Sequence, residues 1–198
     1  MNNPESKVLV IASDIAKYGV KSSGESTQGA GSCAMLVSGN PRILEFNNDN
    51  VCLTRDVMDF WRPNYSQYAF VEGRFSTEQY LDCLTTTWNR YIEKSKQSLN
   101  DFSAVCLHLP YPKLGLKGLT LLLEQAEEEK KEELLARFNE SIQYSQRVGN
   151  IYTGSLFLGL LSLLENNNTL EAGNKIGLYS YGSGAVAEVF SLTLVEGY

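Results

Sequence analysis

The chain has 198 residues, enough for one sizeable hydrophobic core or for two halves of a layered fold. Hydrophobic residues make up 43% and charged residues 20%, as in an ordinary soluble protein, and the net charge of −6 argues against nucleic-acid binding, which needs a basic face. The longest apolar stretch, residues 156–164, is too short to span a bilayer, and the N-terminal sequence lacks a signal-peptide pattern. We therefore expect a cytoplasmic protein with no membrane contact.

The first elements predicted along the chain are two short strands. Residues 7–12 form an apolar run rich in Val and Ile, which predicts a buried strand that ends at residues 13–14. After a loop rich in Gly, Ser and Thr, residues 33–37 predict a second buried strand, which the Gly-Asn-Pro sequence at 39–41 stops. Residues 43–46 are expected to continue this strand after the turn.

A long helix is predicted after an irregular segment. Residues 56–68 mix aromatic, proline and charged residues and are expected to be ordered but irregular. The helix begins at Thr77, because residues 76–79 fit a capping box in which a hydroxyl and a Gln side chain each satisfy a backbone N–H. Apolar residues at helical spacing predict one buried face. These residues are Tyr80, Leu81, Leu84, Trp88, Tyr91 and Ile92.

The middle of the chain predicts a buried strand followed by two helices. The strand lies within residues 101–109 and ends at Pro110. The helices cover residues 113–125 and 127–146, and the Gly-Asn sequence at 149–150 ends the second one.

The last third predicts a buried helix and a strand pair. The helix opens at residues 153–155, is apolar nearly all round, and ends at the three asparagines 166–168. Residues 176–180 form a strand, 181–184 a tight turn, and 185–195 a second strand antiparallel to the first. This order of strands and helices predicts an α/β fold.

His108 is the only histidine and follows a predicted strand, at the end of the sheet where α/β proteins gather their ligands. It could transfer a proton or polarise a carbonyl, or it could be a buried histidine without a chemical role. Cys106 lies two residues earlier and points to the same face, but a Cys–His pair is the less favoured interpretation, because neighbours on one strand seldom aim at each other.

Two further polar residues have both a functional and a structural interpretation. Asn150 precedes the buried helix, where its amide could anchor a carbonyl or cap the chain turn. Ser183 is flanked by Gly182 and Gly184 between two strands. A nucleophile elbow needs a following helix, so this motif is either a hairpin turn or a backbone donor for an oxyanion or a thioester carbonyl.

Three charged residues complete the candidates. Lys113 and Lys117 follow His108 at the start of a helix and could meet phosphates, although surface lysines are the commoner case. Asp14 ends the first predicted strand and could orient a catalytic group or cap the next segment. We expect no metal site, because the four cysteines are widely spaced and form no CxxC pair.

Taken together, six stretches resemble 3-hydroxy-3-methylglutaryl-CoA synthases, most closely the bacterial ones. They occur in the family's order, cover most of the chain and are specific as a set, although SYGSG alone is not. The stretches are residues 8–19, 24–39, 56–65, 106–119, 147–166 and 176–190.

The resemblance implies an incomplete thiolase-like fold of stacked helix and sheet layers. Residues 1–50 would end the N-terminal half, and residues 51–198 would form a truncated C-terminal half. It further implies an acyltransferase of the mevalonate pathway of isoprenoid biosynthesis. Its substrates would be acetyl-CoA and acetoacetyl-CoA, with no cofactor beyond these coenzyme A thioesters, and we expect a homodimer or another form of self-association.

By the same resemblance, His108 holds and polarises the acetoacetyl group and Asn150 assists it. The residues matched to substrate contacts or to a supporting role near them are Ser183, Lys113, Lys117 and Asp14.

The family's nucleophilic cysteine and its glutamate acid/base fall before the first residue, and none of the four cysteines has the nucleophile's sequence context. Since the condensation needs a covalent acyl site and a base, we expect the chain to be inactive alone. A separate chain carrying the N-terminal segment could restore activity. The alternatives are a non-catalytic remnant that binds CoA thioesters and an enzyme of polyketide β-branching. We also expect exposed sheet edges and apolar surface.

Overall fold

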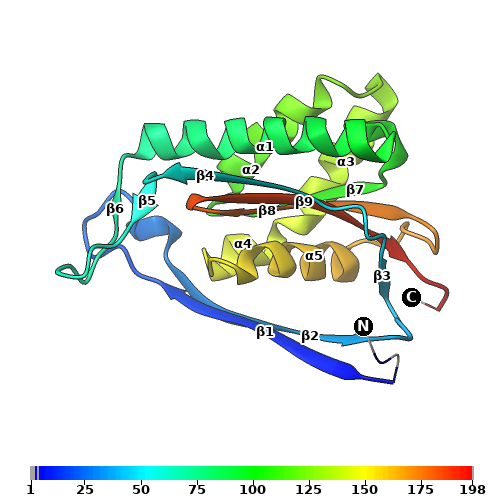
Figure 1. Cartoon of the computed structure of the whole chain (residues 1–198), viewed down its shortest axis with the longest axis horizontal. Coiled ribbons are helices and arrows are strands. Elements are labelled where there is room, and N and C mark those ends of the chain that lie inside the picture. Colours follow the sequence, from blue (N-terminus) through cyan, green and yellow to red (C-terminus); the bar gives the residue numbers. More distant parts are fainter. Residues whose placement is uncertain (1–2, 4, 198) are drawn as a thin grey trace.

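The structure is a computed structural model that describes residues 3 and 5–197, and it confirms the α/β class (Figure 1). Across these residues every helix is too short or too polar to cross a bilayer. The helices are α1 (Gly73–Ser95), α2 (Pro112–Leu123), α3 (Glu128–Ser141), α4 (Gln143–Val148) and α5 (Gly154–Asn166). The strands are β1 (Lys7–Ala16), β2 (Gly29–Ser38), β3 (Leu44–Phe46), β4 (Val51–Val57), β5 (Phe60–Trp61), β6 (Phe70–Val71), β7 (Ala104–Leu107), β8 (Lys175–Gly182) and β9 (Gly184–Leu194).

The main sheet has five strands in the order β3-β9-β8-β7, and β4 pairs with β9 farther along the same edge as β3. The pair β8–β9 is antiparallel, as the sequence predicts, whereas β7 and β8 are parallel. Helices α1 and α2 lie on one face of this sheet and α5 on the other (Figure 1). Helix α3 packs against β7, the strand at the other edge.

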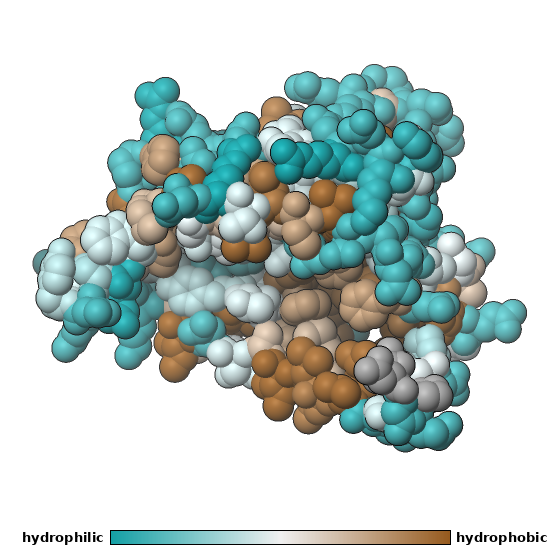
Figure 2. Space-filling view, viewed as in Figure 1, coloured by the Kyte–Doolittle hydropathy of each residue, from teal (hydrophilic) through white to brown (hydrophobic). Residues whose placement is uncertain are grey.

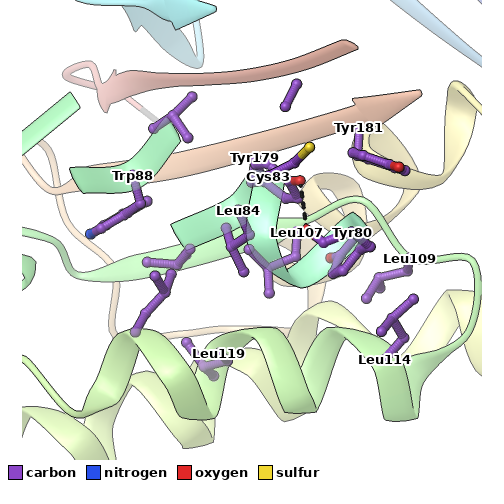
Figure 3. Packing of buried hydrophobic residues seen from close by; sticks show 14 of the residues in the cluster. Tyr80, Cys83, Leu84, Trp88, Leu107, Leu109, Leu114, Leu119, Tyr179 and Tyr181 are labelled. Atoms are coloured by element: carbon purple, nitrogen blue, oxygen red, sulfur yellow. Dashed lines mark hydrogen bonds between the residues drawn. The ribbon is translucent and has the colours of Figure 1, made fainter. Parts of the chain in front are cut away.

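Strand β7 contributes side chains to the hydrophobic clusters on both faces of the main sheet. All four of its residues are buried, with Val105 and Leu107 in the cluster under α1 and Ala104 and Cys106 in the cluster under α5. This alternation confirms the buried strand predicted within residues 101–109. Figure 3 shows Leu107 among the side chains of α1 and α2.

Helix α1 begins earlier than the capping box at 76–79 predicts. Glu72 is the actual N-cap, and its carboxylate accepts from the backbone N–H groups of Arg74 and Phe75. The N–H of Ser76 already bonds to the Glu72 carbonyl, so the predicted box lies inside the first turns. The predicted apolar face is confirmed, since Tyr80 and Trp88 are fully buried on it.

Three other boundaries differ from the sequence predictions. The helix expected over 127–146 is divided at Ile142 into α3 and α4. Residues 44–46 do not extend β2 but pair with β9 in the main sheet. The segment 56–68 is only partly irregular, because β4 reaches Val57 and β5 pairs with β6.

The first two strands form a separate antiparallel pair, here called the β1–β2 ribbon (residues 7–38). It was expected to be buried and to end its first strand at 13–14, but β1 continues to Ala16 and most of the ribbon is exposed. Its inner face packs on α5, while Leu9, Ile11 and Leu36 on the outer face are 60%, 59% and 65% exposed. Figure 2 shows hydrophobic residues gathered on this side of the molecule. The ribbon is apolar on both faces, and other described residues cover only its inner face.

Candidate functional site

His108 follows β7 directly and is held by its backbone. Its N–H donates to the Tyr179 carbonyl at 2.8 Å, and its carbonyl accepts from the Tyr80 hydroxyl at 2.8 Å. The residue is 8% exposed, and burial lowers the pKa of its imidazole to about 4. The ring is therefore neutral at pH 7 and can both donate and accept a hydrogen bond.

Cys106 is not activated by the histidine. Burial raises the pKa of its thiol to about 12, so the thiol stays protonated at neutral pH. Its side chain belongs to the apolar cluster between the sheet and α5. This environment supports the core interpretation of Cys106, because a nucleophilic cysteine needs a stabilised thiolate.

Asn150 lies between α4 and α5, is 4% exposed, and makes hydrogen bonds with both polar atoms of its side chain. Its Nδ2 donates to the Tyr18 hydroxyl at 2.9 Å. Its Oδ1 accepts from the Tyr152 N–H at 2.9 Å and from the Ser155 hydroxyl at 3.1 Å. These bonds fix the direction of the amide. Its Oδ1 caps the turn that leads into α5.

Gly149 explains why the chain can bring this segment against the ribbon. Its φ is +82°, and a Cβ there would lie 2.2 Å from the Gln28 carbonyl oxygen. Only glycine fits both conditions. The close approach allows the Asn150 N–H to donate to the Thr27 carbonyl at 2.9 Å.

An aromatic cluster lies next to Asn150, because Tyr18 and Tyr152 both hydrogen-bond to its amide. The rings of Tyr18, Phe60 and Tyr152 lie with centroids 6.0 to 6.4 Å apart. Burial raises the pKa of Tyr152 and is the largest cause of the shift. A hydrogen bond with Tyr18 and the charge of Asp14 raise it further. Asp14 itself is exposed on β1, where its Oδ1 accepts from the next backbone N–H at 2.8 Å. Its charge thus acts on this cluster from the ribbon.

Ser183 occupies the turn between β8 and β9, as predicted, and its hydroxyl donates to Asp59 Oδ2 at 2.8 Å. The same carboxylate accepts from Tyr181 at 2.8 Å, from Ser76 at 3.2 Å and from the Gly184 N–H at 3.1 Å. Asp59 is 1% exposed, so these donors replace the water that a carboxylate requires. Sequence reasoning missed Asp59, because its donors lie far away in the sequence.

A cleft of about 290 Å³ is lined by the residues that follow His108 and by those that precede Asn150. Three segments line it: residues 26–28 before β2, residues 109–112 after His108, and residues 145–149 before Asn150. Arg147, which sequence reasoning missed, contributes an exposed side chain to its wall. Lys113 and Lys117 are exposed one turn apart on α2, which starts where the 109–112 wall ends.

The structure therefore brings most of the predicted residues to one region in two groups. His108 and Asn150 are the chain neighbours of two segments that line the cleft, and the lysines lie on the helix that starts at the end of the first of these segments. Ser183 belongs to the Asp59 group, which Phe60 joins to the Asn150 cluster through its contact with Tyr152.

Comparison with known proteins gives one consistent family. A family model described as hydroxymethylglutaryl-coenzyme A synthase C terminal matches residues 47–136 and 125–197. The hydroxymethylglutaryl-CoA synthase of Enterococcus faecalis is 53% identical over 196 residues, covering 99% of this chain and 51% of that protein. A solved HMG-CoA synthase complexed with CoA superposes with a TM-score of 0.95 at 58% identity, covering 98% of this chain and 50% of that one.

A more distant relative is the polyketide biosynthesis 3-hydroxy-3-methylglutaryl-ACP synthase PksG of Bacillus subtilis, 30% identical over 96% of this chain and 49% of that protein. The chain spans about half the length of the curated relatives it matches. The superposition confirms the expected thiolase-like fold for this part. The chain belongs to the hydroxymethylglutaryl-CoA synthase family.

Proposed function

We propose that the chain supplies the part of a hydroxymethylglutaryl-CoA synthase that binds and polarises the acetoacetyl thioester. The reaction would condense acetyl-CoA with acetoacetyl-CoA to HMG-CoA in the mevalonate pathway of isoprenoid biosynthesis, in the cytoplasm. The observation that carries the proposal is the cleft, because two of its walls lead directly into His108 and Asn150.

In this proposal the neutral imidazole of His108 donates a hydrogen bond to the ketone oxygen, where negative charge develops as the new carbon–carbon bond forms. A neutral donor is available at pH 7 because burial holds the pKa of His108 at about 4. Asn150 assists His108 in this proposal, and its amide, which Tyr152 and Ser155 hold in place, costs no reorganisation during the reaction.

The remaining candidates act on substrate binding. Lys113 and Lys117, exposed on the helix beyond the cleft, attract the phosphates of coenzyme A, and Arg147 adds a third positive charge at the wall. Ser183 lies near the thioester in a turn that Asp59 holds in place. Asp14 supports the site through Tyr152.

In this proposal none of the four cysteines is the acyl site. Burial raises the pKa of all four thiols, and for Cys52, the exposed one, the charge of Glu188 adds to the effect. Low reactivity is expected of such thiols, since the thiolate is the nucleophile. We therefore propose that the acetyl group is carried by a second polypeptide, and that the chain has no condensing activity alone.

The β1–β2 ribbon is the proposed docking surface for that polypeptide. Its outer face exposes apolar residues, and the curated relatives are about twice as long as this chain. Under the same proposal, residues 1–50 end one half of the fold and residues 51–198 belong to the other. Without the second polypeptide, we expect two copies to associate through the ribbon as a homodimer.

The test is a condensation assay with acetyl-CoA and acetoacetyl-CoA, run with the purified chain alone and with the N-terminal half of the E. faecalis relative. We expect turnover only in the mixture, and we expect His108→Ala to abolish it. No turnover in the mixture, with CoA still bound by the chain, would favour the non-catalytic remnant. The polyketide alternative has weaker support, because the carrier-protein relative is 30% identical and the CoA enzyme 53%.

A further inference from the structure

One hydroxyl in the wall of the cleft has no hydrogen-bond partner. Within residues 3 and 5–197, four buried side-chain atoms lack one, and only Ser145 Oγ belongs to a residue that lines the cleft. Ser145 is 4% exposed, on helix α4. An unpaired buried hydroxyl is unfavourable, so its presence beside a cleft requires an explanation.

Other buried serines nearby are satisfied within the protein. The Ser141 hydroxyl donates to the Phe138 carbonyl at 2.8 Å, and the Ser162 hydroxyl donates to the Glu140 carbonyl at 2.6 Å. A serine inside a helix can make such a bond to a carbonyl of the preceding turn, as Ser141 does. Ser145 could do the same but leaves its hydroxyl uncommitted.

The position of Ser145 is fixed by the turn that leads to Asn150. Its own carbonyl accepts from the Gly149 N–H at 2.9 Å, which closes the last turn of α4. Across the cleft lie residues 26–28 and residues 109–112, the latter bringing Tyr111 and two prolines. The lining therefore combines apolar side chains with several polar ones, and an arm of methylene and amide groups can contact both kinds.

We propose that Ser145 Oγ donates a hydrogen bond to an amide carbonyl of the pantetheine arm of the bound thioester. A change of χ1 between staggered rotamers turns the hydroxyl from its buried position toward the ligand. The inference rests on the proposed function, because it assumes that the cleft takes the arm of a CoA thioester. The inference assigns to Ser145 the recognition of the pantetheine arm, whereas the lysines are proposed to bind the phosphates.

The test compares Ser145→Ala with Ser141→Ala, a matched loss of a satisfied hydroxyl, by calorimetric titration of the purified chain with CoA and with pantetheine. We expect Ser145→Ala to weaken both ligands by roughly 3- to 10-fold, the worth of one hydrogen bond. Its melting temperature without ligand should equal or exceed that of the wild type. Ser141→Ala should melt at a lower temperature and bind both ligands as the wild type does.

The outcomes separate this inference from the function on which it rests. If the wild type binds CoA and Ser145→Ala binds it equally well, the inference is rejected and the proposed function stands. If Ser145→Ala lowers the melting temperature as Ser141→Ala does, the hydroxyl has a partner within the protein and the inference is also rejected. If the wild type binds neither ligand, the cleft is not a CoA-thioester site and both fall.

Discussion

Ser183 and Asp59 are 124 residues apart in sequence, yet the Ser183 hydroxyl donates to Asp59 Oδ2 at 2.8 Å. The carboxylate also accepts from Tyr181, Ser76 and the Gly184 N–H. It therefore joins α1, the end of β8 and the start of β9 at the turn that carries Ser183.

Replacing this carboxylate should destabilise the fold. In Asp59→Asn an amide NH₂ faces buried donors, and we expect the free energy of unfolding to fall by about 2–3 kcal/mol, the worth of a hydrogen bond to a charged group plus the unpaired donors. Urea unfolding followed by circular dichroism measures the change. Asp56→Asn, at an exposed position on β4, is the control and should leave the unfolding midpoint unchanged. Equal midpoints for both variants would contradict the role of Asp59.

The stability of the chain should fall on acidification partly because of His108. Its folded-state pKa of about 4 lies below the ordinary value of 6.5, so between these pH values the unfolded chain binds more protons. By linkage, stability rises with pH through this window and is lost as the pH falls from 6.5 toward 4. We expect urea midpoints at pH 7 and pH 4.5 to differ less in His108→Gln than in the wild type. Parallel behaviour of the two proteins would mean that His108 titrates normally.

Self-association should depend on the outer face of the β1–β2 ribbon. Ile11→Lys places a charge where two apolar surfaces would meet, so we expect the mass measured by light scattering to shift from dimer to monomer. Leu116→Lys is the control, because Leu116 is 42% exposed but lies on α2. A dimer that persists in Ile11→Lys and dissociates in Leu116→Lys would assign the contact to another face.

Lys113 should act on the phosphates of coenzyme A and on nothing nearer the reacting atoms. We expect Lys113→Gln to weaken CoA binding by roughly 2- to 5-fold at low salt, and less at high salt, because charges at an exposed position are screened. Pantetheine, which has no phosphate, should bind as before. Lys131→Gln on α3 controls for the loss of net charge. A loss of pantetheine binding in Lys113→Gln would place the lysine along the arm.

The burial of an element could be predicted from the sequence where other elements of the same chain cover it. The sequence pattern of β7 predicts burial on both faces, and that of α1 predicts one buried face. In both cases helices or strands among the described residues cover those faces. The prediction that β1 is buried was wrong, because other described elements cover only one of its faces. Its pattern requires cover on both faces, and a pattern does not reveal whether the cover belongs to the same chain.

The sequence offers candidate residues where a residue type is rare or a backbone position is special, as with His108 and Asn150, and their roles stay predictions. Asp59 was missed because its significance comes from donors on Ser76, Tyr181 and Gly184, far away in the sequence. The start of α1 was misplaced because the pattern at 76–79 repeats a cap that Glu72 already supplies. Long-range hydrogen bonds leave no local signature.

The contacts of Asn150 join the candidate site to the exposed β1–β2 ribbon. Its amide donates to Tyr18, just after β1, and its backbone N–H donates to Thr27, just before β2. Opening of the ribbon in native-state hydrogen exchange would therefore release Asn150 as well. A polypeptide that binds to the ribbon would slow exchange at both places, so that binding on one surface would make Asn150 more rigid.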